Sequence, residues 1–403
     1  MSLNKFPRVP YAMTIHDQEE INAVVEVLKT STQMGPKTKE FEEKVAEIYG
    51  HTFGIGTNSG SSSLYIAMEV LNLPKGSEVI TPVLTFATTI GCIVKSGCIP
   101  AFIDSESSQK FIIDVNKIEK MINKNTKAMC IPNLMGNMPN WEEIKKIAHK
   151  YNLKILEDSA DVIGANYNNK KSGFYSDICI TSFYGMHMIN CAGNGGMMLT
   201  SNEKYKNDAK LLRSWGRSSS LFVESEKIEN RFNVYLDNIQ YDAKFIFEKV
   251  GYMLEPSELG SAFGLVQLKK LDNILKKRKN NANSHINFFK KYQEWLELPE
   301  MGEHVNSYWF AFPMIIKEKA PFTRTDLQIF FEKRNIQTRV IFTGNSIRQP
   351  AFKNINKKID PEGYPVADRV MSRGILIACH HGLNDSMIEH IYNSFEEFIK
   401  KYL

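Results

Sequence analysis

The chain has 403 residues, of which 43% are hydrophobic and 24% charged, and this composition excludes a disordered protein. The formal net charge of +5 is small and spread along the chain, so nucleic acid is not an expected partner. The longest apolar run, residues 308–316, is shorter than the roughly 20 residues that span a membrane, and residues 1–5 lack the apolar core of a signal peptide. These features predict a cytoplasmic protein with no membrane partner.

Strand-like and helix-like segments alternate between residues 39 and 201. Strands are predicted at 52–57, 78–81, 99–104, 128–132, 153–157, 178–183 and 196–200, and helices at 61–73, 88–96 and 141–151. This alternation predicts an α/β fold with a mostly parallel central sheet and helices on both faces. Ligands of such sheets bind at the carboxyl ends of the strands, where the polar clusters of this sequence also occur.

The pattern changes after residue 204. Residues 205–250 are rich in charged and aromatic side chains and predict a loop-rich insertion, followed by helices at 256–275 and 276–297. The remainder predicts strands at 308–316, 338–342 and 375–379 and helices at 325–334 and 387–402. We therefore divide the chain into a large domain, residues 1–275, and a small C-terminal α+β domain, residues 276–403.

The six cysteines are scattered through the sequence. No CxxC pair is present and none of them clusters with histidine at metal-ligand spacing, so we predict buried thiols and no metal site. An iron–sulfur cluster, which is usually held by four cysteines gathered together, is likewise not expected.

Small polar residues begin the helix that follows the first strand. Ser59, Gly60 and Ser61 combine free backbone N–H groups, hydroxyl donors and the positive end of the helix dipole, which together can bind a phosphate. The same residue types also serve as an ordinary helix cap, so this motif alone leaves both interpretations open.

Three further residues are candidates for chemistry at strand ends. Asp158 ends an apolar strand, where a half-shielded carboxylate can hold a protonated ring nitrogen, although it can also cap a loop. Ser182 can add a hydroxyl to a bound anion. His187 lies in the loop between the strands at 178–183 and 196–200, where a side chain can reach a ligand, and a structural histidine has the same pattern.

Taken together, these motifs resemble a known family. The pair Gly60-Ser61, together with Phe86, Asp158 and Ser182, has the order and spacing of the pyridoxal-phosphate-dependent sugar aminotransferases, the DegT/DnrJ/EryC1/StrS family. The resemblance runs from about residue 32 to 271 and more loosely to the C-terminus. The resemblance implies fold type I, like aspartate aminotransferase. In that family a lysine five residues after the serine of the Ser-Phe motif forms a Schiff base with the cofactor, and here this residue is His187.

Histidine at this position is similar to the sugar 3-dehydratase branch of the family, and so are the motifs at residues 134–139, 215–217 and 338–350. Imidazole forms no stable Schiff base, so the resemblance implies pyridoxal or pyridoxamine phosphate held without a covalent bond. It further implies that Ser59, Gly60, Ser61 and Ser182 bind the phosphate, that Phe86 covers one face of the ring, that Asp158 pairs with the ring nitrogen and that Asp161 flanks the other side. Arg217, Arg339 and Asn345 are the implied substrate-binding residues.

The reaction implied by this branch removes the C3 oxygen of a nucleotide-linked, GDP-bearing 4-keto-6-deoxy sugar. L-Glutamate is the amino donor, His187 is the base, and ammonia and a 3,6-dideoxy-4-keto sugar for surface polysaccharide are the products. The unperturbed pKa of histidine, about 6.5, suits a residue that takes up and returns a proton. Two alternatives stay open, an aminotransferase that uses another lysine such as Lys170 or Lys171, and a non-catalytic protein that binds the sugar nucleotide or the cofactor.

The family also implies a homodimer with shared active sites. Two residues depart from its pattern there. Met253 replaces an asparagine that reaches the cofactor phosphate of the other subunit, and Glu255 replaces a basic residue. Some members of the branch carry an iron–sulfur cluster ligated after the histidine, and the lack of any cysteine between Cys191 and Cys379 argues against one here.

Overall fold

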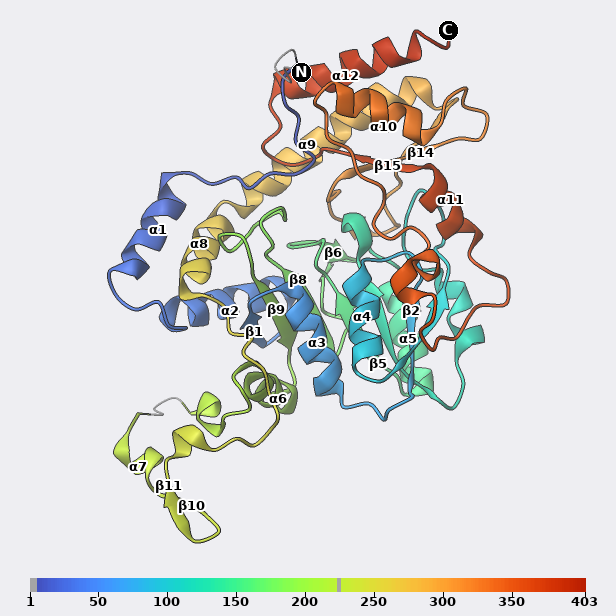
Figure 1. The fold of residues 1–403 in the computed structure, drawn as a ribbon. Coiled ribbons are helices and arrows are strands. Elements are labelled where there is room, and N and C mark those ends of the chain that lie inside the picture. The colour runs from blue at the N-terminus through green and yellow to red at the C-terminus, as the bar shows by residue number, and fades with distance from the viewer. Residues whose placement is uncertain (1–5, 223–225) are drawn as a thin grey trace.

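A seven-stranded sheet forms the centre of the larger of two units (Figure 1). The computed structural model describes residues 6–222 and 226–403, and its strand order in this sheet is β1-β9-β8-β5-β4-β2-β3. The five strands from β8 to β3 pair in parallel, and β9 alone runs antiparallel to its neighbours β8 and β1. The strands are β1 (Phe53–Thr57), β2 (Glu78–Pro82), β3 (Ile99–Ile103), β4 (Thr126–Pro132), β5 (Lys154–Asp158), β8 (Ile178–Ser182) and β9 (Gly196–Thr200). The predicted α/β fold with a mostly parallel sheet is confirmed.

Helices cover both faces of this sheet, and its strands are therefore buried on both sides. Val79 and Leu156 belong to one core cluster with Ile66 of α3, whereas the adjacent Ile80 and Ile155 pack on the opposite face with α5. This is the alternation that a pleated strand imposes on its side chains. The helices of the larger unit are α1 (Gln18–Leu28), α2 (Pro36–Tyr49), α3 (Gly60–Leu71), α4 (Ala87–Lys95), α5 (Trp141–Tyr151), α6 (Glu203–Arg213), α7 (Ile228–Arg231) and α8 (Glu258–Lys269).

The smaller unit holds a three-stranded antiparallel sheet with an aromatic-rich core. Its strands are β12 (Leu296–Glu297), β14 (Phe312–Ile316) and β15 (Gly374–Ile377), and its helices are α10 (Arg324–Lys333), α11 (Pro365–Arg373) and α12 (Asp385–Ile399). Helix α9 (Leu271–Phe289) leads into it from the larger unit. Because α9 runs through residue 275 without interruption, the domain boundary placed there stays a prediction.

Two minor sheets complete the strands. The edge strands β6 (Asn166–Tyr167), β7 (Lys170–Lys171) and β13 (Val305–Asn306) form one, and the hairpin of β10 (Val234–Leu236) and β11 (Ile239–Tyr241) forms the other. This hairpin and α7 belong to an arm, residues 214–222 and 226–253, that projects from the body of the molecule. The arm occupies most of the segment predicted as a loop-rich insertion.

The structure corrects two predicted elements. The helix expected at 256–275 is two helices, because the chain turns at Lys270 between α8 and α9. The strand expected at 338–342 is irregular: Arg339 makes a single bridge with Leu376, and Phe342 then adopts a positive φ of 43° that turns the chain. Val340 and Phe342 line a cavity, whereas Ile341 between them packs into the core of the smaller unit.

Close packing of α3 against the sheet predicts a strong effect at Gly196. A Cβ there would lie 2.2 Å from the carbonyl carbon of Ser59. Because this neighbour is a backbone atom, it cannot move away by a change of side-chain rotamer. We expect Gly196→Ala to lower the free energy of unfolding in urea by about 3 kcal/mol. The control is Gly91→Ala in α4, whose Cβ would meet only the Tyr65 hydroxyl at 3.3 Å and which gains up to about 1 kcal/mol in helix propensity. Equal stability of the two variants would contradict this account of the packing.

Candidate active site

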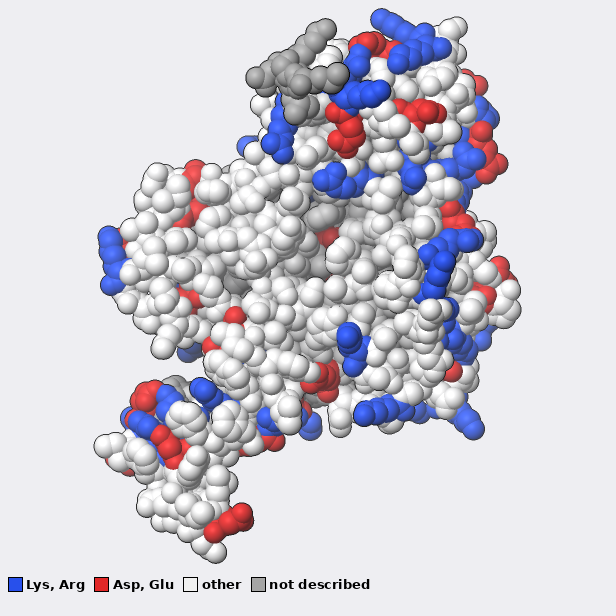
Figure 2. Space-filling view, viewed as in Figure 1, with Lys and Arg blue, Asp and Glu red and all other residues white. Residues whose placement is uncertain are grey.

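A cavity of about 540 Å³ opens where the carboxyl ends of the central strands face the smaller unit. Figure 2 shows this face hollowed between the two units, with walls that carry few charged side chains. Nine of the residues predicted for the site line the cavity together: Ser59, Gly60, Ser61, Phe86, Asp158, Asp161, Ser182, His187 and Arg339. They come from the ends of four different strands and from the smaller unit, so the fold and not the sequence order brings them together.

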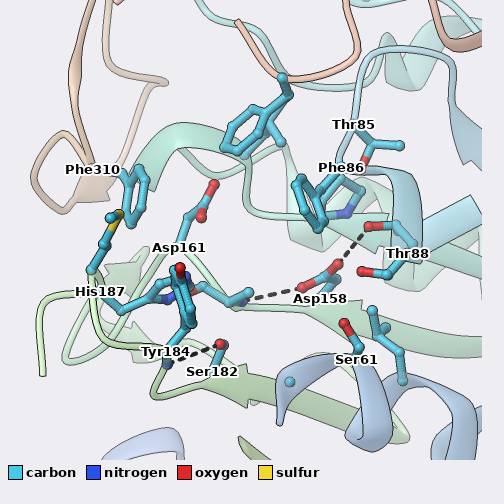
Figure 3. Close-up of a pocket in the computed structure, with 18 of the residues that line it drawn as sticks. Ser61, Thr85, Phe86, Thr88, Asp158, Asp161, Ser182, Tyr184, His187 and Phe310 are labelled. Atoms are coloured by element: carbon cyan, nitrogen blue, oxygen red, sulfur yellow. Dashed lines mark hydrogen bonds between the residues drawn. The ribbon is translucent and has the colours of Figure 1, made fainter. Parts of the chain in front are cut away.

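One end of the cavity is built as an anion site. The Ser59 side chain caps α3 by accepting from the N–H of Ser62 at 3.1 Å, which leaves the N–H groups of Gly60 and Ser61 at the open start of the helix. A Cβ on Gly60 would lie 2.6 Å from the Cβ of Ser182, so only glycine lets the helix start approach β8 this closely. Figure 3 shows the Ser61 and Ser182 side chains at this end of the cavity.

A buried carboxylate ends β5 in the middle of the site. Asp158 accepts from the hydroxyl of Thr89 at 2.7 Å and from the N–H of Ala160 at 3.2 Å. Burial raises the pKa of Asp158, and these two hydrogen bonds oppose the rise. A protonated ring nitrogen would relieve the cost of burying this charge. Sequence reasoning missed Thr89, although its place in the first turn after β2 was a signal that it reaches the strand ends.

Phe86 and Asp161 lie on different sides of the space in front of Asp158 (Figure 3). The Phe86 ring is 52% exposed and meets Phe342 edge-on, with centroids 6.0 Å apart, so its face is available to a flat ligand. The Asp161 carboxylate accepts from the N–H of Met135 at 2.9 Å. Burial raises the pKa of Asp161 to about 7, and the charge of Asp158 adds to the rise.

The turn that holds Asp161 is strained and buried. Met135 has a φ of 60° and is wholly buried, and the next residue, Gly136, has a φ of 92° with a Cβ position 2.0 Å from the carbonyl oxygen of Tyr308. Only glycine fits at 136, and the left-handed residue before it directs its N–H at the carboxylate. The hydrogen bond from Met135 to Asp161 was not predicted, because a methionine with left-handed backbone angles has no recognisable pattern in the sequence.

His187 lies in the β8–β9 loop with one nitrogen fixed. Its Nδ1 is 2.8 Å from the carbonyl oxygen of Ala160, and because that oxygen only accepts, the proton of the neutral ring sits on Nδ1 and Nε2 keeps a lone pair. Burial lowers the pKa of His187 to about 4, against the effect of the Ala160 hydrogen bond. The ring packs edge-on against Phe310, with centroids 5.2 Å apart.

Two predicted substrate-binding residues do not line this cavity. Arg217 lies in the arm, where its guanidinium is 4.4 Å from the ring centroid of Trp215 and also faces Phe245 and Phe247. Asn345 is buried and donates to Asp368 at 2.8 Å, so it supports the loop that follows Phe342. Of the predicted arginines, Arg339 alone lines the cavity.

The two residues that depart from the family pattern, Met253 and Glu255, contact Ser214 of the same chain. Met253 is 54% exposed and pairs with Ser214 through a backbone bridge, and the Glu255 carboxylate accepts from the Ser214 hydroxyl at 2.6 Å. The adjacent Leu254 carbonyl accepts from the N–H of Asn58, which precedes the anion site. The segment is therefore packed beside the start of α3.

The cavity is lined by no lysine in the part of the chain that the structure describes. Lys170 and Lys171, the alternative Schiff-base residues, are exposed on β7, where Lys171 donates to the Glu47 carbonyl at 2.7 Å. All six cysteines are buried, and within residues 6–222 and 226–403 no three His, Cys, Asp or Glu side chains gather as metal ligands. None of these helices combines the length and apolar character needed to cross a bilayer.

These features are the ones that pyridoxal phosphate requires. The helix start and two hydroxyls fit its phosphate, the buried Asp158 fits its ring nitrogen, and the exposed Phe86 face fits its ring. The site therefore defines a fold-type I pyridoxal-phosphate protein whose cavity is lined by His187 and, among the described residues, by no lysine.

The chain belongs to the DegT/DnrJ/EryC1/StrS aminotransferase family, whose model matches residues 14–396. It is 32% identical over 402 residues to the lipopolysaccharide biosynthesis protein RfbH of Salmonella typhimurium, covering 97% of this chain and 91% of the relative. It is 30% identical over 412 residues to the dTDP-4-dehydro-2,6-dideoxy-D-glucose 3-dehydratase of Saccharopolyspora spinosa, covering 98% and 87%. The solved GDP-4-keto-6-deoxy-D-mannose-3-dehydratase of E. coli with bound hydrated PLP is 26% identical and matches with a TM-score of 0.86 over 96% of this chain and 100% of that one.

The buried Asp161 predicts a pH-dependent stability. Its pKa in the folded protein is raised to about 7 from 3.8, so the stability it contributes is full below about pH 4 and is lost as the pH rises through 7. We expect Asp161→Asn to raise the free energy of unfolding of the cofactor-free protein at pH 8, by up to about 4 kcal/mol, and the gain to shrink toward pH 4. The control Asp237→Asn, in the exposed turn between β10 and β11, should stay close to the wild type at both pH values. An Asp161→Asn protein less stable than the wild type at pH 8 would overturn this interpretation.

Proposed function

We propose that this protein is a pyridoxal-phosphate-dependent 3-dehydratase of a nucleotide-linked 4-keto-6-deoxy sugar. L-Glutamate supplies the amino group and the two electrons and leaves as 2-oxoglutarate, and the other products are ammonia and a 3,6-dideoxy-4-keto sugar used in surface polysaccharide. The single observation that carries the proposal is His187, an imidazole at the Schiff-base position, in a cavity whose described lining contains no lysine. Because no lysine amine is available there, the cofactor stays bound without a covalent bond to the protein. The last step of an amino-sugar synthesis, in which a lysine takes the cofactor back from the product, is then not possible.

In the structure the His187 ring is neutral and has one nitrogen free to accept a proton, although its pKa lies below the value of about 6.5 expected from the sequence. Burial lowers its pKa to about 4, so the ring is neutral near pH 7 and Nε2 can take up a proton. The Ala160 carbonyl keeps the ring in one tautomer and in one orientation while Nε2 returns that proton to the departing C3 hydroxyl. The edge-on contact with Phe310 limits water on one side of the ring.

The remaining residues bind and orient. Gly60, Ser61 and Ser182 hold the phosphate, Asp158 pairs with the ring nitrogen, and Thr89 fixes the carboxylate that does so. When bound, the cofactor supplies the amino group and the electron-withdrawing ring that make loss of the C3 oxygen feasible. Arg339 carries the positive charge that suits a phosphate or a carboxylate of the substrates.

The identity of the sugar rests on the relatives. Dehydratases of a dTDP-linked and a GDP-linked keto sugar are both similar to this chain over nearly its whole length. The GDP-linked substrate follows the branch that the His187 motif resembles. The family description names aminotransferases, so amination through another lysine is the second candidate, and the exposed positions of Lys170 and Lys171 outside the cavity disfavour it.

A homodimer with shared active sites is part of the proposal. The arm exposes many apolar side chains, among them Ile228, Ile239 and Val250, whose exposed fractions are 71%, 65% and 96%. A monomeric protein rarely exposes so much apolar surface in one place. It also carries Arg217, which lies outside the cavity of its own subunit. Docking of the arm on a second copy would cover the apolar surface and bring Arg217 to the partner's cavity.

The reaction is tested with a panel of substrates. Protein, pyridoxal phosphate and L-glutamate are mixed with GDP-, dTDP- and CDP-linked 4-keto-6-deoxy sugars, and ammonia and product mass are measured. We expect ammonia release and loss of one oxygen at C3 with at least one sugar. His187→Lys is the matched variant, in which dehydration should vanish because the amine captures the cofactor. An amino sugar from the wild type would favour the aminotransferase, and no turnover of any sugar would favour the non-catalytic alternative.

The shared site is tested by mixing two inactive variants. His187→Gln removes the base and Arg217→Glu inverts the charge on the arm, and each should reduce activity by at least tenfold alone. If Arg217 serves the partner's cavity, a mixed dimer has one intact site, so refolding the two variants together should restore about one quarter of wild-type activity. No recovery in dimers shown to be mixed by mass spectrometry would place Arg217 in its own subunit's site or outside both.

A further inference from the structure

The segment before α1 contacts both units and lines the cavity with Tyr11. We call residues 6–16 the N-terminal strap, and its first half is fixed to the smaller unit. The N–H of Val9 donates to the Asn335 carbonyl and its carbonyl accepts from the N–H of Gln337, both at 2.9 Å. The carbonyl of Pro10 lies 3.0 Å from Nε2 of His380. The two Val9 bonds join backbone to backbone and are therefore independent of any ligand.

The second half of the strap is fixed to the larger unit. The hydroxyl of Thr14 donates to the carbonyl of Gly185 at 2.7 Å, two residues before His187. The side chain of Gln267 in α8 donates to the carbonyl of Ile15 at 3.1 Å. The strap thus joins the smaller unit to the loop that carries His187, as the course of the chain in Figure 1 also shows.

Tyr11 lies between these two anchors and lines the cavity. Its backbone N–H donates to the side-chain oxygen of Gln337 at 3.1 Å, and the guanidinium of Arg339 lies 5.5 Å from its ring centroid. Burial raises the pKa of the Tyr11 phenol, and the charge of Asp161 raises it further. The hydroxyl therefore keeps its proton and can donate a hydrogen bond inside the cavity that Tyr11 lines.

A phenol donor beside a guanidinium is a combination that binds carboxylates. Arg339 is the one Arg or Lys among the described residues that line the cavity. An amino acid carries a carboxylate one bond from its reacting carbon, whereas the diphosphate of a nucleotide sugar is several bonds from C4. Arg339, which lies over the Tyr11 ring in the wall of the cavity, therefore suits the carboxylate better than the diphosphate.

We propose that Tyr11, presented by the N-terminal strap, binds the carboxylate of the amino donor together with Arg339. The inference rests on the proposed function for the identity of the amino donor. It adds to that function a residue that binds the donor and that lies on the N-terminal strap, outside the central sheet. Tyr11 takes no part in proton transfer in this account. Its effect should therefore be confined to binding of the donor.

The test separates the two halves of the reaction. Protein loaded with pyridoxal phosphate is titrated with L-glutamate and followed by cofactor absorbance, and protein loaded with pyridoxamine phosphate is given the sugar and followed by ammonia release. In Tyr11→Phe the half-saturating glutamate concentration should rise about tenfold, because a hydrogen bond to a charged group is lost. The dissociation constant of glutarate, a dicarboxylate that cannot react, should rise similarly, while ammonia release changes less than twofold.

Controls fix the meaning of each outcome. Tyr151→Phe, on the exposed end of α5, should behave as the wild type in every titration. Equal losses in both halves would make Tyr11 a structural or sugar-binding residue, and unchanged glutamate and glutarate binding would overturn the proposal outright. Failure of the proposed function would give a different result: the wild type would release no ammonia, while its glutamate and glutarate titrations would remain measurable.

Discussion

The hydrogen bond between Nδ1 of His187 and the carbonyl of Ala160 is the contact on which the site depends. It fixes the tautomer of the ring, and with it the nitrogen that keeps a lone pair. It also joins the β8–β9 loop to the turn after β5, whose backbone at Ala160 donates to Asp158. His187, the proposed base, and Asp158, the proposed partner of the cofactor ring, are thus both positioned by the main chain of Ala160. A lysine amine could make one such contact but could not hold a second nitrogen in a defined direction.

The strand alternation explains why neighbouring carboxylates have different roles. Asp158 faces the cavity, whereas the adjacent Glu157 points to the other side, where it accepts from Asn133 at 2.7 Å and from Ser159 at 2.7 Å. Burial raises the pKa of Glu157, and these hydrogen bonds oppose the rise. Glu157 ties together the loops behind β5, which keeps Asp158 at a fixed depth. Because the pleat of β5 directs consecutive side chains to opposite sides, Glu157 makes structural hydrogen bonds while Asp158 lines the cavity.

Much of this arrangement could be predicted from the sequence because it follows from local patterns. Apolar runs separated by amphipathic helices gave the parallel sheet, and strand-end positions gave Asp158 and Ser182. Tyr11 could not be found this way, because the pairing of Val9 with the segment after α10 is a contact across more than 300 residues. Residues 338–342 look like a strand in the sequence because apolar residues that line a cavity, such as Val340 and Phe342, have the same composition as those that pair in a sheet.

Borohydride reduction of the cofactor-loaded protein, followed by mass spectrometry under denaturing conditions, tests the central claim most directly. An imidazole at residue 187 forms no reducible bond to pyridoxal phosphate, so the mass of the denatured chain should equal that of the cofactor-free protein. A covalent pyridoxyl adduct mapped by peptide sequencing to Lys170, Lys171 or any other lysine would show that the cofactor is tethered, and would contradict the account of a site in which His187 replaces the Schiff-base amine.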